Sequence, residues 1–229
     1  MERQERRTRI EYLSGFVTER RLARFHEVLN QRTRYITVAL EDIYQPHNAS
    51  AVLRSCDGFG VQDAYIIENR NSYTVNPGVE LGTRQWLTLR RFSGEEYNTS
   101  RAIARLRSRG YRIVATTPHA GDVPLEEFDL TAGPAAFFFG NELDGLSTAM
   151  LEEADEYMRI PMYGFVESFN ISVSCALTLH HLSHRLRGSD SPWRLSGEER
   201  EELLLQWLRS SIKRVDEIEK ARFSPSSEE

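Results

Sequence analysis

Residues 135–147 read AAFFFGNELDGLS, so five apolar residues run directly into a loop of glycines and acidic residues. A short run that is apolar at every position is typical of a strand covered on both faces in a parallel sheet. Ligands of open α/β sheets lie beyond the carboxyl ends of such strands. The loop that begins at Gly140 is therefore expected to line a ligand site.

Strand-like and helix-like segments alternate on both sides of this stretch. Apolar runs rich in β-branched and aromatic residues predict strands at 35–40, 64–67, 86–89, 111–116, 135–139 and 157–160. Helical spacings, caps and terminating glycines predict helices at 48–56, 100–109, 147–154 and from about 170 to 187. This alternation predicts an α/β fold with a mostly parallel sheet and helices on both faces.

Helical extensions flank the central domain of residues 35–187. Residues 1–34 place apolar residues at helical spacing and are expected to form a helix bent or divided near Gly15. A polar linker opens the extension 188–223, in which Gly197 to Phe223 are expected to form one amphipathic helix. The tail 224–229 has the composition of a disordered segment.

Charge is distributed unevenly along the chain, whose formal net charge is −5. Residues 1–34 carry nine arginines and five glutamates, a net charge of +4, which leaves −9 for the remaining residues. A basic arm on an acidic body is expected of a protein that binds phosphate groups locally. A GC-rich genome would also favour arginine codons, so composition alone leaves both explanations open.

Several classes of protein are disfavoured by what the sequence lacks. No apolar run approaches the ~20 residues of a membrane span, and the first residues lack the apolar segment of a secretory signal. We therefore expect a cytoplasmic protein with no membrane contact. Dinucleotide-binding, phosphate-loop and hydrolase motifs are also missing.

Neither cysteine nor histidine forms a recognisable metal site. Cys56 and Cys175 are too few for a disulfide framework and lack metal-ligand spacing, so we expect buried, reduced thiols. His180 and His184 have the four-residue spacing of two ligands on a helix, but no third ligand accompanies them. We expect these histidines at the edge of a helix packing face, and no bound metal.

A first polar interruption of the apolar pattern lies in residues 46–54, PHNASAVLR. The side chain of Asn48 suits the N-cap of a helix, where it would accept a hydrogen bond from a free backbone N–H. This structural interpretation and a functional one both remain open. Arg54 follows three apolar residues of the same helix, so we expect it to be partly buried beside an anionic partner.

The second interruption is the loop 140–147, GNELDGLS. Gly140 and Gly145 allow backbone conformations and a close ligand approach that a Cβ would prevent. Glu142 and Asp144 resemble paired catalytic carboxylates or calcium ligands, but the EF-hand spacing and a second acidic cluster are missing. We therefore favour a buried ion pair between Glu142 and Arg54 over a metal site.

The third interruption is the stretch 160–172, IPMYGFVESFNIS. An apolar strand end, a proline, a glycine and a capped helix make a loop rich in free backbone groups. Backbone N–H and C=O groups of such a loop suit an adenine ring and a sulfonium amino acid. Taken alone, the same stretch is also a turn that ends in the N-cap of a helix.

These three segments, in this order, resemble the three motifs of the SPOUT superfamily of RNA methyltransferases, in particular the tRNA (guanosine-18)-2′-O-methyltransferase family. The matching stretches are NASAVLRSCDGFG at 48–60, FGNELDGLS at 139–147 and IPMYGFVESFNIS at 160–172. The similarity spans residues 35–187. Glu167 stands where glutamine is common in this family, and Phe169 where leucine is.

The resemblance implies features that periodicity does not reveal. It implies a C-terminal trefoil knot and an obligate homodimer, in which motif one of one subunit lies near the methyl donor of the other. The implied cofactor is S-adenosylmethionine, bound largely by the backbone of four residues: Thr116, Gly140, Ile160 and Phe169. The implied catalytic residue is Arg54, supported by Asn48, Glu142, Ser168 and Asn170.

The resemblance also implies that the helical extensions hold tRNA. The arginines of the first extension are then candidates for phosphate contacts: Arg6, Arg7, Arg9, Arg20, Arg21 and Arg24. The short N-terminal arm favours tRNA over ribosomal RNA as the substrate.

The implied reaction moves a methyl group to the ribose 2′-OH of a tRNA nucleotide, with guanosine 18 of the D-loop as the expected target. A guanidinium, with a pKa above ~12, is a poor base in isolation. Our hypothesis is that Arg54 binds the adjacent phosphate and stabilises the developing alkoxide, whether or not it accepts the proton. The alternatives are another tRNA position, ribosomal RNA, or a non-catalytic RNA-binding protein of the same fold.

Overall fold

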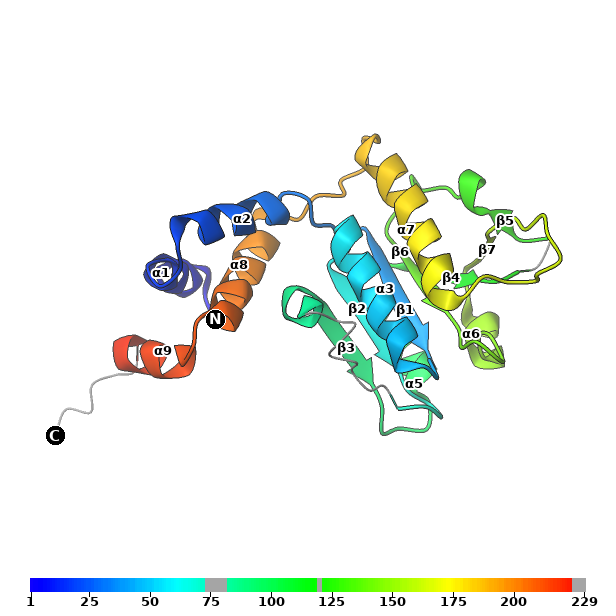
Figure 1. Cartoon of the computed structure of the whole chain (residues 1–229), viewed down its shortest axis with the longest axis horizontal. Coiled ribbons are helices and arrows are strands. Elements are labelled where there is room, and N and C mark those ends of the chain that lie inside the picture. The colour runs from blue at the N-terminus through cyan, green and yellow to red at the C-terminus, as the bar shows by residue number, and fades with distance from the viewer. Residues whose placement is uncertain (73–81, 119–120, 224–229) are drawn as a thin grey trace. The chain divides into compact units, whose positions relative to one another are not determined.

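The computed structural model describes residues 1–72, 82–118 and 121–223 (Figure 1). The predicted disordered tail, 224–229, lies outside the described residues. The chain divides into two compact units, one of Thr33–Trp193 and one of Met1–Arg32 with the chain from Arg194 onward. The two terminal extensions thus belong to one unit, and the central segment forms the other.

The central unit is built on a seven-stranded sheet in the order β3-β2-β1-β6-β4-β7-β5, and every described strand pairing is parallel. Its strands are β1 (Ile36–Glu41), β2 (Asp63–Ile67), β3 (Thr88–Phe92), β4 (Arg112–Thr116), β5 (Val123–Pro124), β6 (Ala135–Phe139) and β7 (Glu156–Arg159). The predicted α/β class and parallel sheet are confirmed.

Helices cover both faces of this sheet, as predicted. Helices α3 (Pro46–Phe59) and α7 (Ile171–Arg187) pack together over one face, and α5 (Asn98–Arg107) and α6 (Thr148–Glu153) lie on the other. Successive strand residues alternate between the two faces. Phe137 of β6 therefore belongs to the core under α3 and α7, whereas the neighbouring Phe138 belongs to the core under α5 and α6.

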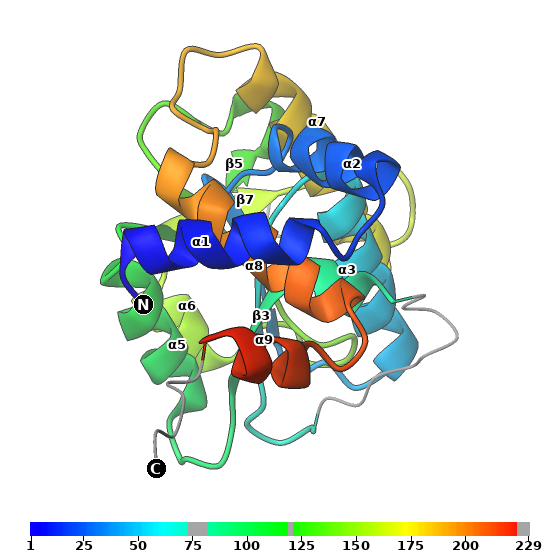
Figure 2. The same ribbon diagram turned by 90° about the vertical axis from the view of Figure 1, so that its left-hand side faces the viewer.

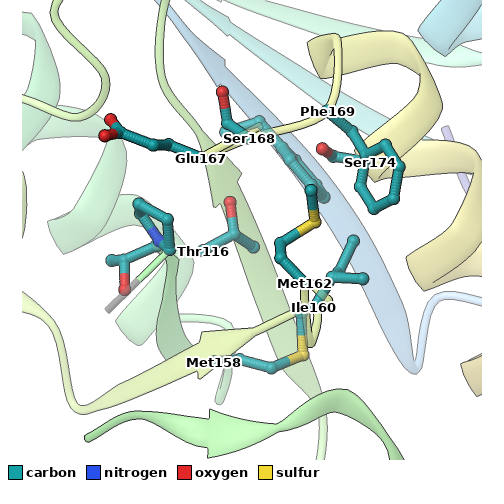
Figure 3. Close-up of a pocket in the computed structure, with 11 residues that line it drawn as sticks. Thr116, Met158, Ile160, Met162, Glu167, Ser168, Phe169 and Ser174 are labelled. Atoms are coloured by element: carbon teal, nitrogen blue, oxygen red, sulfur yellow. The ribbon is translucent and has the colours of Figure 1, made fainter. Parts of the chain in front are cut away.

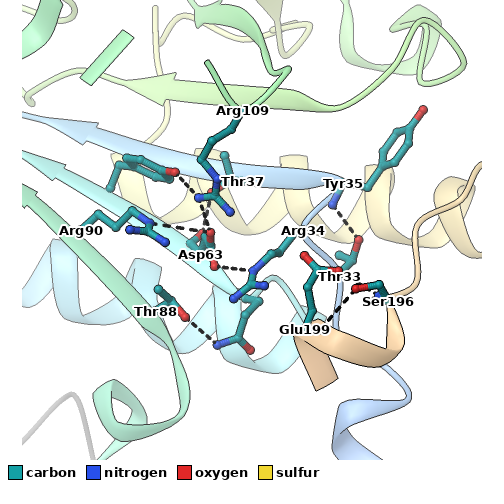
Figure 4. A network of polar contacts seen from close by, with 12 residues as sticks. Thr33, Arg34, Tyr35, Thr37, Asp63, Thr88, Arg90, Arg109, Ser196 and Glu199 are labelled. Carbon is teal, nitrogen blue, oxygen red and sulfur yellow. Dashed lines mark hydrogen bonds and ion pairs between the residues drawn. The ribbon is translucent and has the colours of Figure 1, made fainter. Parts of the chain in front are cut away.

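A buried carboxylate holds the amino edge of the sheet together (Figure 4). Asp63, at the start of β2, is fully buried and accepts hydrogen bonds from Arg34 Nε at 3.0 Å and Arg109 Nη1 at 2.7 Å. Arg90 Nε of β3 lies 4.0 Å from the same carboxylate. Because a buried carboxylate needs such partners, these contacts tie β2 to β3 and to the segments that lead into β1 and β4.

The strands differ from the sequence prediction in two places. The strand predicted at 86–89 begins at Thr88, because Thr83–Trp86 form a short 3-10 helix, η1. The edge strand β5 was not predicted, since its two residues are too few to produce an alternating pattern.

The terminal unit consists of α1 (Arg3–Ser14), α2 (Glu19–Leu29), α8 (Gly197–Ser211) and α9 (Val215–Phe223). Helix α8 packs against α1 and α2 (Figure 2). The predicted division near Gly15 is confirmed. The single helix predicted from Gly197 to Phe223 is wrong, because the chain leaves the helix at Ile212 and Arg214 takes a left-handed φ of 58°.

Ion pairs join α1 to the two C-terminal helices. Arg6 is buried and lies within 4.0 Å of Glu198, Glu201 and Glu202 of α8. Arg7 pairs with Glu201 at 2.7 Å, and Arg9 with Glu219 of α9 at 3.0 Å. These arginines therefore neutralise glutamates of the same unit.

No helix in the described ranges has the length and apolar character needed to cross a lipid bilayer.

Replacing Phe137 with alanine tests the core between the sheet and α7. Phe137 is fully buried in β6 and packs edge-to-face on Phe128, with the ring centroids 5.1 Å apart. We expect Phe137→Ala to lower the free energy of unfolding by about 3–5 kcal/mol, through lost burial and a cavity. Urea titration followed by circular dichroism measures this change. The control Val123→Ala, at an exposed position of β5, should cost far less; equal losses would contradict the assignment.

Candidate functional site

Two adjoining cavities open at the carboxyl edge of the sheet, where β4, β6 and β7 end. The larger has a volume of about 500 Å³ and the smaller about 100 Å³. They share lining residues from the loops after β4, β6 and β7, among them Thr116, Phe139 and Phe169. The larger cavity is within the usual range for a small-molecule site.

The four residues expected to bind a cofactor all line these cavities. Thr116 and Phe169 line both, Ile160 lines the smaller cavity and Gly140 the larger one. Thr116 ends β4, and its hydroxyl donates to the carbonyl of Phe138 at 2.7 Å. The ends of three strands thus bring together residues that are distant in the chain, the outermost of which, Thr116 and Phe169, are 53 positions apart.

The third motif of the sequence analysis included Ile160 and Met162, but Met158, which completes the apolar wall of the smaller cavity, was not singled out. Met158 and Met162 lie on either side of Ile160 along the chain and line the same space (Figure 3). Methionine side chains are flexible and polarisable, and they adapt to flat or irregular ligands. Met158 lies near the carboxyl end of β7, and this position was the signal that could have identified it.

Gly140 is required by the packing of its own loop. A Cβ at this position would overlap the backbone of Gly145 and Leu146, since the two arms of the loop touch there. Asn141 N–H donates to Gly145 O at 3.0 Å, and Gly145 N–H donates back to Asn141 O at 3.2 Å. At Gly140 the close approach that the structure shows is one between backbone segments, while Gly145 supplies the left-handed φ of 70°, and the predicted close approach of a ligand stays a prediction.

A buried carboxylate anchors the far end of this loop. Glu41, at the end of β1, is 1% exposed and accepts hydrogen bonds from Ser147 N–H and Ser147 Oγ, both at 2.8 Å. It also accepts one from Thr99 Oγ1 at 2.5 Å. Glu41 was missed by the sequence analysis, because a single acidic residue at the end of an apolar strand carries no motif.

A chain of hydrogen bonds joins the three motifs on the α3 side of the loop. Asn48 Nδ2 donates to Glu142 Oε1, and Asn170 Nδ2 donates to Asn48 Oδ1 at 3.2 Å. Asn170 Oδ1 in turn accepts from the N–H of Ser172 at 2.9 Å and caps α7. Glu142, Asn48 and Asn170 therefore lie together, as their predicted shared role requires.

The N-cap interpretation of Asn48 was wrong. Helix α3 begins earlier, with Gln45 as its N-cap and Pro46 as its first residue. Asn48 therefore lies inside the first turn and is 2% exposed, with its amide turned toward Glu142. Proline suits the first helical position because it has no N–H to leave unpaired, and this signal could have placed the helix start.

The expectation that Arg54 is partly buried was also wrong. Val52, Leu53 and Cys56 of α3 face the core, whereas Arg54 is exposed. It lies six residues beyond Asn48, about 9 Å further along the helix axis. Glu142 is half-buried, and its described hydrogen bonds come from Asn48 and from the N–H of Tyr44. The ion pair between Glu142 and Arg54 stays a prediction.

Ser168 and Glu167 lie on the exposed loop between β7 and α7 and line both cavities.

In the part of the chain that the structure describes, no group of three or more His, Cys, Asp or Glu side chains is arranged to hold a metal ion. The ring of His180 contacts that of Phe59 edge-to-face, at 5.9 Å between centroids. Cys56 and Cys175 are both buried and reduced.

The parallel sheet and the cavities at its carboxyl edge define an α/β protein that binds a small molecule beyond its strand ends. The chain belongs to the SpoU rRNA methylase family, whose model matches residues 35–180. The resemblance inferred from the three motifs is thereby confirmed.

Similar proteins match nearly the whole chain. The tRNA (guanosine(18)-2′-O)-methyltransferase of Borreliella burgdorferi is 43% identical over 92% of this chain and 94% of its own length. The Thermus thermophilus protein of the same name is 35% identical over 84% and 97%. The crystal structure of the Aquifex aeolicus TrmH/SpoU tRNA-modifying enzyme superposes with a TM-score of 0.73 at 31% identity, over 84% of this chain and 96% of that one.

Replacing Gly140 with alanine tests the tight loop. The added Cβ would force the Gly145–Leu146 backbone away, so we expect Gly140→Ala to lower the free energy of unfolding by about 1–3 kcal/mol. Chemical denaturation measures the loss. The matched control is Gly164→Ala, where an added Cβ meets no atom within 4 Å, and it should leave stability nearly unchanged. Equal stability of the two variants would contradict this account of the loop.

Proposed function

We propose that this protein transfers a methyl group from S-adenosylmethionine to the ribose 2′-OH of a tRNA nucleotide, with guanosine 18 as the target. The observation that carries the proposal is that motifs two and three line one cavity, and that Asn48 of motif one is hydrogen-bonded to Glu142 and Asn170 of these motifs. Relatives bearing the tRNA (guanosine(18)-2′-O)-methyltransferase name align along almost their full length. The enzyme is expected to work in the cytoplasm, where tRNA is modified.

The cavity suits S-adenosylmethionine, which would supply the methyl group on a cationic sulfonium. The apolar side chains of Met158, Ile160 and Met162 offer a surface for the adenine ring. The carboxylates of Glu142 and Glu167 line the larger cavity and complement the positive charges of an amino acid and a sulfonium. AviRb of Streptomyces viridochromogenes, a SpoU methyltransferase, has been crystallised with this molecule. Its structure superposes on this chain with a TM-score of 0.59 at 23% identity.

The proposed catalytic step depends on positioning and charge. Glu142 holds the amide of Asn48, and Asn170 holds it from the other side, so the polar side chains that would orient the ribose are fixed in advance. We assign two roles to Arg54. It binds the phosphate next to the target ribose, and it stabilises the negative charge that develops on the 2′-oxygen. Ser168 would assist from the loop that lines the cavity.

The outward direction of Arg54 supports a site shared by two chains. Arg54 is exposed and does not line either cavity of its own chain within the described residues. Large apolar side chains are exposed on the neighbouring loop and on α7: Tyr163, Phe165, Val166, Val173 and Leu177. A patch of this kind marks an interface. We propose a homodimer in which Arg54 of one chain reaches the cavity of the other. We also propose that the C-terminal segment of each subunit forms a trefoil knot.

The RNA contacts of the terminal unit are best assigned to α2. Arg6, Arg7 and Arg9 of α1 are engaged by glutamates of α8 and α9. Arg20, Arg21 and Arg24 of α2 are exposed, and the described ion pair of Arg24 is an exposed one with Glu27 of the same helix. Exposed ion pairs of this kind contribute little to stability, so the arginine can leave the glutamate and bind a phosphate instead.

Replacing Arg54 tests the catalytic assignment. We expect Arg54→Ala to lower kcat on tRNA by roughly 10²–10³-fold, as for the loss of one charge-stabilising donor. Arg54→Lys should recover part of this, since it keeps the charge and loses the bidentate geometry. The measurement is transfer of a labelled methyl group, with mapping of the 2′-O-methylated nucleotide. Near-normal turnover by either variant would exclude the proposed role.

A mixed dimer tests whether the site is shared. A purified heterodimer of Arg54→Ala and Asn170→Ala chains would contain one undamaged site if Arg54 acts on the partner's cavity. We then expect about half of the wild-type activity per dimer, whereas each homodimer is inactive. A heterodimer as inactive as its parents would place Arg54 in the site of its own chain.

Neutralising α2 tests the RNA contacts. The triple variant Arg20→Gln, Arg21→Gln and Arg24→Gln should bind tRNA more weakly, and the slope of log affinity against log salt should fall by about 2–3. Affinity for S-adenosylmethionine should stay the same. The control is Arg7→Gln, whose guanidinium is held in an ion pair with Glu201 at 2.7 Å. A slope unchanged in the triple variant, or reduced as much by the control, would contradict this assignment.

A further inference from the structure

A second cleft lies on the other side of the motif-two loop. Its volume is about 210 Å³, and it is bounded by the ends of β1 and β2, the start of α5 and the loop 141–147. Asn141, Asp144, Gly145 and Leu146 line both this cleft and the larger cavity. The same loop is thus a wall shared by the two spaces.

The size and lining of the cleft suit a single planar ring system. Its volume is below the roughly 300–1,000 Å³ of sites for drug-sized ligands, and most of the residues that line it have polar side chains. Tyr97, at the start of α5, is 66% exposed and lines the cleft. An exposed aromatic ring beside a polar cleft offers a surface on which a nucleobase can stack.

Arg70 lines the same cleft, and its backbone is held by hydrogen bonds to the carboxylate of Asp42. Asp42 is 8% exposed, and its Oδ1 accepts hydrogen bonds from the N–H groups of Asn69 at 2.7 Å and of Arg70 at 2.9 Å. Asp42 itself adopts a left-handed φ of 53°, which is unfavourable for a residue with a Cβ. Strained backbone of this kind is concentrated at functional sites.

Asp144 meets Arg70 from the shared wall. Its carboxylate lies 3.7 Å from the Arg70 guanidinium, and both side chains are more than two-thirds exposed. Such a pair is weak, so the guanidinium can be turned toward a ligand at little cost. Asn141 Oδ1 accepts from the N–H of Asp144 at 2.7 Å and fixes this part of the loop.

We infer that this cleft binds the base of the target nucleotide and that Arg70 and Tyr97 select guanine. This inference rests on the proposed function. The guanidinium would donate two hydrogen bonds to O6 and N7 of guanine, while Tyr97 stacks on the ring. Adenine places an amino group where guanine has O6, so it would meet donor against donor. With the base in the cleft, the ribose lies over the motif-two loop, next to the cavity assigned to the methyl donor.

Glutamine at position 70 provides a sharp test, because glutamine pairs with N6 and N7 of adenine. Full-length wild-type and variant enzymes are assayed on tRNA transcripts that carry guanosine or adenosine at the target position. We expect Arg70→Gln to lower kcat/KM for the guanosine transcript by roughly 5- to 150-fold and to raise the adenosine-to-guanosine ratio. Tyr97→Ala should weaken both transcripts to a similar degree, and cofactor affinity should be unchanged in both variants.

The matched control is Arg101→Gln, which removes an exposed arginine of α5 whose ion pair with Glu95, at 3.8 Å, is as weak as that of Arg70. It should leave both kcat/KM values unaltered. An Arg70→Gln enzyme that kept the wild-type preference for guanosine would overturn the inference while leaving the proposed function intact. A wild-type enzyme that methylated neither transcript would refute the proposed function and this inference together.

Discussion

The site depends on the buried carboxylate of Glu41. It ends the inner strand β1 and accepts three hydrogen bonds, one from α5 through Thr99 and two from Ser147 at the start of α6. A carboxylate without water is stable only when such donors surround it. The contacts therefore fix the far end of the motif-two loop relative to the sheet, and this loop is the wall that separates the larger cavity from the second cleft.

The near end of the loop is fixed by shape. Gly140 brings its backbone against that of Gly145, so the loop closes into a narrow arch directly after β6. These contacts hold both ends of the loop, and the carboxylate of Glu142 forms a continuous chain of hydrogen bonds with Asn48 and Asn170. Preorganised polar groups of this kind need no rearrangement when a substrate arrives.

Sequence patterns predicted the strands and the three loops well because apolar runs and glycines are local signals. They failed where tertiary contacts decide. Asn48 has a side chain that suits an N-cap, but the helix begins earlier, at Pro46, and the amide of Asn48 donates a hydrogen bond to Glu142. Arg54 follows three apolar residues, yet it projects from the outer side of α3. Glu41 carries no motif at all, since its importance arises from Thr99 and Ser147, which are distant in sequence.

Charge offers the clearest case of a pattern that the fold reinterprets. The net charge of +4 over residues 1–34 suggests a basic arm, but α1 has counter-ions in α8 and α9, about two hundred residues away along the chain. Once those glutamates are counted, α1 contributes little positive potential to its surface. On α2, by contrast, the side chains of Arg20, Arg21 and Arg24 are exposed. The sum of charges along a segment therefore predicts nucleic-acid binding only when its partners in the folded unit are known.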